Sequence, residues 1–556
     1  MLARTGRRIL SLSGRTSDCK QMRKLTTATE QYIIKSPIPD IIPPPKGNFI
    51  NYVFKDINKW RNKEALRCSV TGNNYTYDEL YQKISKFASL LTKLGVTKGD
   101  VVAIHAINSP DYAIAYYGTM FVGAIVSPIS TTYTPGEILN QLRDCRATIV
   151  VGHPLLELQL IKALESYGQN RHLLMYGPSR STAAINLLQA IDDPNIGFTN
   201  PVQLTGDEPA VIPYSSGTTG APKGVVQTHD AFSNFFNGIT HPHIFSALSG
   251  EYQDQFMALL PFYHTYGMNI MNCALFNGMR VVTVPKFDPK TFVKTVADHK
   301  LEHLHIVPPI LAFLVNSPTA TSKALASLKS IVIAAAPVAP TLAHAIKDKL
   351  DKDIFFQEAY GMTEVFVTHQ TPVAGEKLGT SGQVIPNCRA KIIDSDTGEA
   401  LPPNTKGEIL LKTPSMMKGY HNNEVATAET IDKDGWLHTG DIGMYDEEGY
   451  FKIVDRTKEL IKVKGMQVSP SELEDVIRRH PKVVDIGVTG VPHERLGEAP
   501  RAFVVCKEPL KPEELHQYME TRLASHKQLA GGITIVESLP KSATGKLLRK
   551  DLQRMA

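Results

Sequence analysis

The sequence lacks several features that mark particular protein classes. It has no run of about eighteen apolar residues, so no membrane-spanning helix is expected. Its six cysteines are scattered without C-x-x-C spacing, which favours reduced, unpaired thiols and argues against a structural zinc site. The formal net charge is only +5, so there is no electrostatic reason to expect nucleic-acid binding. With 556 residues the chain exceeds what one hydrophobic core usually serves, and we expect more than one domain.

The small positive excess is concentrated at the N-terminus. Residues 1–27 are rich in serine and threonine and contain one acid, Asp18, against seven basic residues: Arg4, Arg7, Arg8, Arg15, Lys20, Arg23 and Lys24. This composition resembles a mitochondrial transit peptide and predicts a matrix protein. A disordered basic tail on a cytoplasmic protein is the alternative. The C-terminal residues do not form a peroxisomal signal.

Helix and strand patterns alternate along most of the chain. The proline-rich segment 28–47 is expected to be an extended lead-in. After it, residues 77–94 have the apolar period of a helix, and residues 101–105 have the pattern of a buried strand. The alternation continues through residues 112–120, 149–151, 281–284, 304–307 and 331–333. This order predicts an α/β fold of layered, largely parallel sheets.

A second, smaller domain is expected near the C-terminus. A short strand at residues 450–454 runs into the charged segment 455–459, which is a plausible hinge. Beyond it we expect a small α+β domain with helices at 471–479 and 512–523 and strands at 483–488 and 502–506. The predicted division is therefore a leader of residues 1–27, an N-terminal domain of residues 28–455 and a C-terminal domain of residues 456–556.

The most informative stretch is Ser215-Ser216-Gly217-Thr218-Thr219-Gly220-Ala221-Pro222-Lys223-Gly224, between two apolar strands. Its glycines allow backbone N–H groups to face one concavity, and its hydroxyls and lysine add donors and positive charge. Such a loop suits a polyphosphate. It is not a Walker A loop, because Lys223 is followed by Gly224 rather than serine or threonine. A flexible glycine-rich linker is the alternative.

Further motifs follow this loop in order: Leu260–Gly267, Tyr360–Glu364, Gly435–Asp441, Val454–Glu459 and Pro540–Lys546. Together with the loop they resemble the signature motifs of the adenylate-forming, AMP-binding superfamily, which includes acyl-CoA synthetases, coumarate-CoA ligases and beetle luciferases. The resemblance extends from about Gly47 to Arg549. It implies a large N-terminal body of several α/β subdomains and a small mobile α+β lid. It also implies an AMP-forming acid–thiol ligase that uses ATP, Mg²⁺ and coenzyme A.

The resemblance also assigns the nucleotide site. The β- and γ-phosphates would be held by Ser215, Ser216, Gly217, Thr218, Thr219, Gly220 and Lys223. Tyr360 would stack on adenine, and Thr363 would contact the α-phosphate. Asp441 and Arg456 would bind the ribose, and Glu364 would bind Mg²⁺. As isolated residues, Asp441 and Arg456 are more typical of a solvated ion pair, and Glu364 of a surface carboxylate.

The same resemblance assigns two alternating reactions to the small domain. Lys546 would bridge the attacking carboxylate and the α-phosphate during adenylation. Lys458 would be the hinge, and the pantetheine tunnel of the second reaction would be lined by Lys462, Gly465 and Gln467. His264 would close the acyl pocket until CoA arrives. A lone histidine is more often a core residue, and a lysine near a C-terminus is usually solvated, so these roles depend on the motifs around them.

The expected acyl pocket is apolar and has no obvious partner for a second polar group. Its implied lining is Tyr266, Ala334, Ala335, Ala336, Ala359 and Gly361. We therefore expect a hydrophobic acid, either a medium- to long-chain fatty acid or an arylalkanoic acid. The pattern departs from that of coumarate-CoA ligases at Ile333–Pro337 and at Glu358-Ala359, which argues against assuming aromatic specificity.

Three other functions share these motifs. A luciferase-like oxygenase would have the same nucleotide site. An enzyme that loads a carrier protein is disfavoured, because no carrier domain is recognised in the sequence. A non-catalytic acyl-nucleotide sensor is disfavoured because Lys546, Glu364 and Asp441 are all present. The expected partner is thus a small carboxylic acid, with no nucleic acid and no transmembrane segment.

Overall fold

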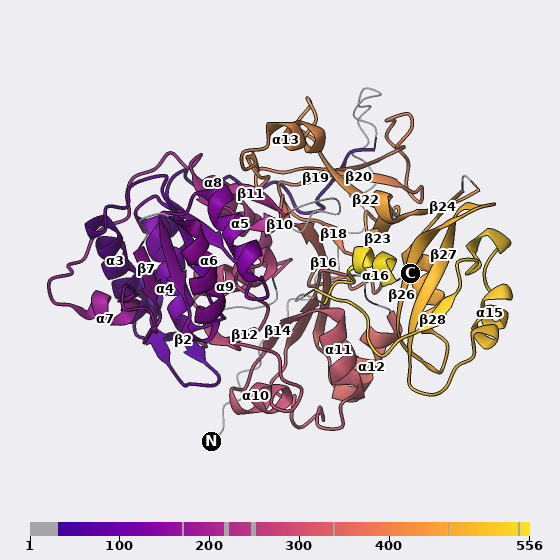
Figure 1. Cartoon of the computed structure of the whole chain (residues 1–556), viewed down its shortest axis with the longest axis horizontal. Helices are drawn as coiled ribbons and strands as arrows, with labels where there is room; N and C mark the ends of the chain where they lie inside the picture. Colours follow the sequence, from indigo (N-terminus) through magenta and orange to yellow (C-terminus); the bar gives the residue numbers. More distant parts are fainter. Residues whose placement is uncertain are drawn as a thin grey trace, which may run out of the picture.

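A computed structural model describes residues 32–168, 172–215, 222–245, 252–336, 338, 340–464, 466–542 and 545–555. Within these residues the strands form four sheets (Figure 1). Two large sheets and their helices form most of the body, together with a third, antiparallel sheet. The fourth sheet belongs to a smaller C-terminal domain at the right of Figure 1. The predicted α/β fold, with a large body and a small α+β domain, is confirmed.

The first large sheet is parallel at its centre. Its strands, in spatial order, are β10 (Tyr214–Ser215), β11 (Lys223–Thr228), β9 (Pro209–Val211), β5 (Ile125–Pro128), β4 (Val101–His105), β6 (Ile149–Gly152), β7 (His172–Met175) and β8 (Ile185–Asn186), and β21 (Gly419–Tyr420) pairs with β11. The predicted strand 101–105 coincides with β4, where all five residues are buried. The pair β10 and β11 is antiparallel, so the phosphate-loop motif lies between two strands as predicted.

The second large sheet is parallel from β16 through β2. Its strands, in spatial order, are β18 (Gln383–Val384), β17 (Phe366–Gln370), β16 (Phe355–Met362), β15 (Ser330–Ile333), β14 (His303–Ile306), β12 (Gln255–Ala258), β13 (Arg280–Thr283), β2 (Glu64–Cys68) and β3 (Asn74–Thr76). The antiparallel partners β17, β18 and β3 lie at its two edges.

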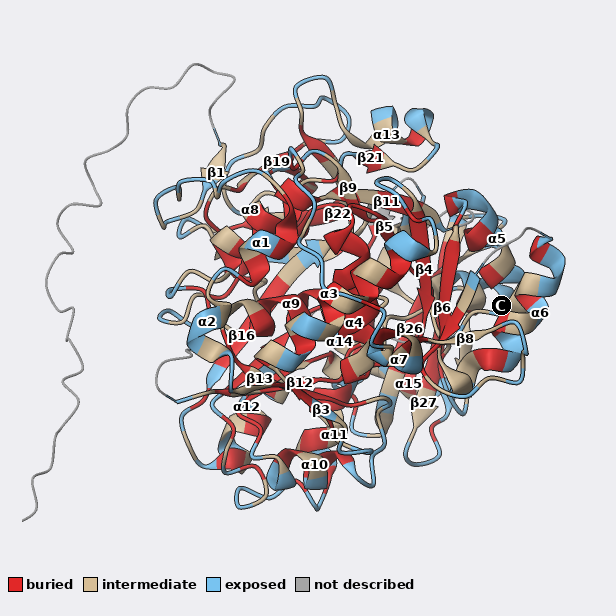
Figure 2. Ribbon diagram, turned by 90° about the vertical axis from the view of Figure 1, so that its left-hand side faces the viewer, coloured by how far each residue is buried: buried red, intermediate tan, exposed pale blue. Residues whose placement is uncertain are grey.

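Helices cover the two large sheets, and the strands between them are largely buried (Figure 2). The helices are α1 (Phe49–Val53), α2 (Ile57–Trp60), α3 (Tyr77–Lys93), α4 (Pro110–Phe121), α5 (Pro135–Cys145), α6 (Glu157–Tyr167), α7 (Leu187–Asp192), α8 (His229–Ile239), α9 (Thr265–Phe276), α10 (Phe292–Asp298), α11 (Pro308–Asn316), α12 (Pro340–Leu350) and α13 (Glu424–Thr430). Helix α3 begins at a capping box in which Thr76 and Glu79 satisfy each other's backbone N–H groups. Its apolar residues face the core, as predicted from their spacing.

The third sheet was not predicted from the sequence. It is antiparallel, in the order β1 (Ile34–Lys35), β19 (Arg389–Ile393), β20 (Gly407–Lys412), β22 (Leu437–Tyr445) and β23 (Phe451–Arg456). Residues 32–47 of the proline-rich lead-in contain no helix, and they supply β1, which pairs with β19. Asp40 forms an ion pair with Arg389, which ties the same segment to the body.

The small domain has one sheet with a core on each face. Its strands are β25 (Met466–Val468), β24 (Ile461–Val463), β27 (Gly497–Cys506) and β26 (Val483–His493), with β28 (Ile533–Ile535) beside β27. Strands β26 and β27 are longer than predicted. On β27, Ala502 and Val504 pack in the cluster that includes α14 (Pro470–Arg478) and α15 (Pro512–Glu520), whereas Phe503 packs against Leu552 of α16 (Arg549–Met555).

Three other expectations concern the chain as a whole. Strand β23 ends at Arg456 and β24 begins at Ile461, and the domain boundary at 455/456 stays a prediction. The cysteines in the described part, Cys68, Cys145, Cys273, Cys388 and Cys506, are free thiols, whereas Cys19 lies outside it. In the described part of the chain, no helix is both long and apolar enough to cross a membrane.

Candidate active site

The candidate site lies at one edge of the second large sheet. Strands β12, β14, β15 and β16 are parallel neighbours, so their carboxyl ends lie along the same edge. The ends of these strands and the segments that follow them contain residues 260–264, 307–309, 334–336 and 360–364, which include parts of two motifs identified in the sequence, Leu260–Gly267 and Tyr360–Glu364. Ligands in open α/β sheets bind beyond the carboxyl ends of the strands. The topology therefore gathers motifs that are up to about a hundred residues apart in the chain.

Glu364 links the motif after β16 to the phosphate loop. Its side chain is only 5% exposed and accepts hydrogen bonds from the hydroxyls of Tyr420, at 2.9 Å, and Ser215, at 3.3 Å. Burial raises the pKa of its carboxyl. Lys223 lies over the ring of Tyr420, with Nζ 4.7 Å from the ring centroid. The predicted loop residues Ser216, Gly217, Thr218, Thr219 and Gly220 lie outside the described residues.

One buried carboxylate beside the phosphate loop fits Mg²⁺, which proteins usually hold through one or two carboxylates together with substrate phosphates. In the described part of the chain, no group of three or more His, Cys, Asp or Glu side chains could form an all-protein metal site. The donor set therefore matches an ion that is shared with a nucleotide.

A second cluster joins three motifs around Asp441. The carboxylate of Asp441 is 6% exposed; one oxygen accepts a 2.6 Å hydrogen bond from the hydroxyl of Tyr360, and the other lies 3.2 Å from Nε of Arg456. Burial raises the pKa of Asp441, and the charge of Arg456 opposes that rise. The register of β22 and β23 places residues 441 and 456 directly opposite each other, which explains why two motifs meet here.

Lys546 lies at a tight turn that reaches this cluster from the small domain. Its backbone N–H donates to Oγ of Ser542 at 3.1 Å, and its carbonyl accepts from the N–H of Ser542 at 2.8 Å. The turn packs closely on the body, because a Cβ on Gly545 would lie 3.1 Å from Cγ of Pro309. Burial, and then the positive charge of Arg456, lower the pKa of Lys546 to about 8.

His264 lies close enough to Lys546 for the charge of the lysine to affect its pKa. It is the N-cap of α9, and its Nδ1 accepts a 3.3 Å hydrogen bond from the backbone N–H of Tyr266. Burial, and then the charge of Lys546, lower the pKa of the imidazole to about 4, so the ring is neutral at physiological pH. A neutral histidine thus contacts the backbone of Tyr266 and is affected by the charge of Lys546, and its role in closing the acyl pocket stays a prediction.

The residues expected to line the acyl pocket are brought together only in part. Ala334 and Ala359 pack with Val332, and the part-exposed side chains of Tyr266 and Val367 complete the cluster. Ala335 and Ala336 follow β15 and are exposed. Gly361 lies against the neighbouring strand, where a Cβ would be 2.0 Å from the carbonyl oxygen of Phe366, so this position requires glycine for backbone packing.

His305 was missed by the sequence analysis. It lies on β14, and its ring centroid is 6.0 Å from that of Tyr266. Its Nδ1 is buried without a hydrogen-bond partner, and burial lowers the pKa of the ring to about 3. A neutral imidazole therefore lies beside Tyr266, one of the residues expected to line the acyl pocket, and the expectation of a pocket without a polar partner stays a prediction. The sequence could have indicated His305, because it lies in the predicted strand 304–307, near the carboxyl end where ligands bind.

The structure adds less about the remaining assignments. The carbonyl of Thr363 accepts a 2.7 Å hydrogen bond from the side chain of Gln227, which fixes its turn. Lys458 and Lys462 are exposed. Gly465 lies outside the described residues, as does the side chain of Gln467. The roles of these four residues in a hinge and a tunnel stay predictions.

Comparison with known proteins agrees with this geometry. Residues 53–421 match the model of the AMP-binding enzyme family, and residues 472–546 match that of the AMP-binding enzyme C-terminal domain. The chain belongs to the AMP-binding enzyme family. It is an AMP-forming acid–thiol ligase with ATP and coenzyme A as co-substrates.

Full-length relatives support the assignment. The chain is 36% identical over 546 residues to the probable 4-coumarate–CoA ligase 3 of Dictyostelium discoideum, covering 94% of this chain and 98% of that protein. It is 33% identical over 536 residues to the 4-coumarate–CoA ligase of Pinus taeda, covering 94% and 97%. Among solved structures, ATP-bound MatB from Rhodopseudomonas palustris matches with a TM-score of 0.83 and 27% identity, over 91% of this chain and 98% of that chain.

Proposed function

We propose that this AMP-binding enzyme activates a hydrophobic monocarboxylic acid, either a medium- to long-chain fatty acid or an arylalkanoic acid. The proposal is carried by the apolar cluster of Val332, Ala334 and Ala359, against which Tyr266 packs. A second carboxylate would be buried there without a counter-ion, at a large cost in free energy. The relatives named as coumarate ligases keep aromatic acids within the proposed class.

In the first half-reaction, an oxygen of the substrate carboxylate attacks the α-phosphorus of ATP and pyrophosphate leaves. Lys546 would hold the two negative groups together and stabilise the charge that develops between them. Tyr360, Asp441 and Arg456 would bind the nucleoside, and Thr363 would orient the α-phosphate. The loop from Ser215 to Lys223 would bind the terminal phosphates. Mg²⁺ at Glu364 would neutralise phosphate charge.

In the second half-reaction, the sulfur of CoA attacks the acyl carbonyl and AMP leaves. We propose that the small domain turns about Lys458, so that Lys546 withdraws and Gly465 lines the path of the pantetheine arm with Lys462 and Gln467. His264, which is neutral, would move aside without the cost of transferring a charge.

Separate measurement of the two half-reactions tests these roles. Lys546→Ala should lower the rate of pyrophosphate release by about 10² to 10³, yet still convert supplied acyl-adenylate to acyl-CoA. Gly465→Leu should form acyl-adenylate and fail to transfer it, because a branched side chain obstructs a tunnel lined by backbone. Equal loss of both half-reactions in both variants would exclude domain alternation.

A panel of acids tests the substrate class and the rival functions. Octanoate and an arylalkanoate should give higher kcat/KM values than acetate or malonate. Oxygen uptake with any acid would favour a luciferase-like oxygenase, and adenylate formation without transfer to CoA in the unmodified enzyme would favour a sensor.

We also propose that residues 1–27 direct the protein to the mitochondrial matrix. The support is the composition of this segment, which lies outside the described residues. Deletion of residues 1–27 should leave the purified enzyme active and the protein cytosolic. Mitochondrial import of the shortened protein would contradict the proposal.

A further inference from the structure

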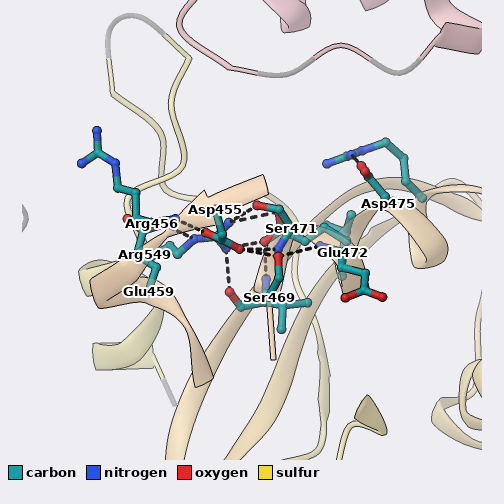
Figure 3. A network of polar contacts seen from close by, with 12 residues as sticks. Asp455, Arg456, Glu459, Ser469, Ser471, Glu472, Asp475 and Arg549 are labelled. Carbon is teal, nitrogen blue, oxygen red and sulfur yellow. Dashed lines mark hydrogen bonds and ion pairs between the residues drawn. The ribbon is translucent and has the colours of Figure 1, made fainter. Parts of the chain in front are cut away.

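The catalytic turn is followed by a buried arginine whose five donors are engaged in one cluster. Arg549 begins α16, three residues after Lys546, and its side chain is only 12% exposed. In Figure 3 the guanidinium lies among residues of the hinge segment and the start of α14. A buried arginine without partners would be costly, so these contacts fix where α16 begins.

Arg549 joins three elements that are distant in sequence. Its Nε donates to Oε2 of Glu459 at 2.7 Å, on the turn η3 (Thr457–Glu459). Its Nη1 donates to the carbonyl of Val488 on β26 at 2.7 Å and to Glu474 on α14, and its Nη2 donates to the second oxygen of Glu474 at 3.2 Å and to Oγ of Ser471 at 3.3 Å. The pairing with Glu474 is bidentate, a geometry that lysine does not reproduce.

Asp455 connects the cluster around Arg549 to Arg456, a residue proposed to bind the nucleotide. One carboxylate oxygen accepts from Oγ of Ser469, at 2.7 Å, and from the N–H of Ser471, at 3.0 Å; the other accepts from the N–H of Arg456 at 2.8 Å (Figure 3). The backbone that carries Arg456, which pairs with Asp441, is therefore tied to the α14 end that Arg549 holds. Displacing Arg549 disturbs the small domain at its junction with the body.

The groups around Lys546 explain why this matters for the reaction. The charges that act on the lysine come from Arg456, Glu459, Asp441 and Arg549, and His264 faces it from the body. Two of these groups, Asp441 and Arg456, already pair with each other. Glu459 is a carboxylate held by Arg549, and its negative charge opposes the lowering of the pKa of Lys546. Without Arg549 this carboxylate loses its partner, and its charge acts on the lysine unopposed.

We propose that Arg549 is a positioning residue for adenylate formation: it engages the carboxylate of Glu459, keeps that group from capturing Lys546, and fixes the turn that carries the lysine. This inference rests on the role proposed above for Lys546. It assigns no contact between Arg549 and the substrates. The loss of Arg549 therefore weakens the first half-reaction selectively.

The first experiment compares Arg549→Ala with Arg554→Ala, an exposed arginine on the same helix whose partner is Asp551. Arg549→Ala should reduce pyrophosphate release at least tenfold and change transfer from supplied acyl-adenylate less than twofold. Arg549→Lys should be intermediate, and Arg554→Ala should match the unmodified enzyme. Equal loss of both half-reactions in Arg549→Ala and Arg549→Lys would overturn the proposal in favour of a purely structural role.

The second experiment uses Glu459 to separate positioning from folding. Glu459→Gln removes the competing carboxylate, so the double variant Arg549→Ala/Glu459→Gln should recover part of the lost adenylation rate. The pH profiles of the two single variants should move in opposite directions. Arg549→Ala removes a cation near Lys546, so the fall in adenylation rate at alkaline pH should move to higher pH. Glu459→Gln removes an anion near Lys546, so that fall should move to lower pH.

These outcomes decide the proposal even if Arg549→Ala does not fold, because Arg549→Lys and Glu459→Gln still report the rate and the direction of the pH shift. The proposal would be overturned if the alkaline limb of the pH profile did not shift in these variants. It would also be overturned if the double variant formed adenylate more slowly than Arg549→Ala. Failure of the role proposed for Lys546 in adenylate formation can be told apart from failure of this inference, because Lys546→Ala would then form adenylate at the rate of the unmodified enzyme. If Lys546→Ala loses adenylation while Arg549→Ala behaves like Arg554→Ala, the inference alone is wrong.

Discussion

The hydroxyl of Tyr360 donates a 2.6 Å hydrogen bond to the carboxylate of Asp441, across 81 residues of sequence. Asp441 thus has a neutral donor on one oxygen and the guanidinium of Arg456 on the other. Both contacts favour the ionised carboxylate against the effect of burial. The three residues proposed to bind the nucleoside are therefore already held together by contacts with one another.

Removing the hydroxyl of Tyr360 tests this arrangement. Tyr360→Phe keeps the ring but leaves one oxygen of Asp441 without its donor, a loss of about 1.5–3 kcal/mol for a bond to a charged group. We expect KM for ATP to rise roughly tenfold, with a smaller change in kcat. Tyr445→Phe is the matched control, since its hydroxyl donates to the carbonyl of Leu401, away from Asp441. A similar rise in KM in both variants would contradict the assignment.

Lys546 predicts a specific pH dependence. In the proposed mechanism the lysine acts as a cation, and its pKa is lowered to about 8. In the free enzyme, kcat/KM for ATP should therefore fall as the pH rises through about 8. Pyrophosphate release measured from pH 6 to pH 10 checks this expectation. In Lys546→Arg the guanidinium stays protonated, so any remaining activity should not fall as the pH rises through about 8. If the fall persists in Lys546→Arg, the titrating group is a residue other than Lys546.

His305 predicts how the acyl pocket discriminates between acids. A neutral imidazole beside Tyr266 can form a hydrogen bond with a hydroxyl near the distal end of the acid. His305→Leu should lower kcat/KM for a hydroxylated arylalkanoate relative to octanoate by roughly tenfold, whereas His305→Gln, which keeps hydrogen-bonding groups, should change the ratio less. An identical ratio in all three proteins would show that His305 does not contact the substrate.

Glu358 predicts a pH-dependent stability. Its side chain accepts a 2.8 Å hydrogen bond from the N–H of Gly379, and burial raises its pKa to about 7. Since the pKa is higher in the folded state, the associated stability is complete below pH about 4.5 and is lost as the pH rises through about 7. At pH 8 the free energy of unfolding of Glu358→Gln should exceed that of the unmodified enzyme by up to about 3 kcal/mol.

Denaturant titrations at pH 5 and pH 8 measure this difference. The gap between Glu358→Gln and the unmodified enzyme should be small at pH 5 and widen at pH 8. A gap that does not change with pH would mean that Glu358 keeps an ordinary pKa in the folded protein.

The local structure followed from the sequence where a short pattern was sufficient. The apolar period of residues 77–94 corresponds to α3, and the apolar run at residues 101–105 corresponds to β4. The order of the motifs predicted the family, since each motif is contiguous in sequence. These predictions succeeded because helix periodicity, capping and strand burial depend on residues that are neighbours in the chain.

Only the tertiary structure decided what lies between distant segments. Ile34 and Lys35 pair with β19 because, in the described part of the chain, one edge of β19 has no other strand beside it. The residues near Ile34 in the sequence do not indicate this. Tyr360 and Asp441 meet because the end of β16 in the second large sheet lies beside the middle of β22 in the antiparallel sheet. His305 lies beside Tyr266 because of the packing around β14, and Arg549 reaches Glu459 through the fold of the small domain. The residues of the candidate site were visible in the sequence, whereas their partners, and hence their pKa values, were set by burial and long-range contacts.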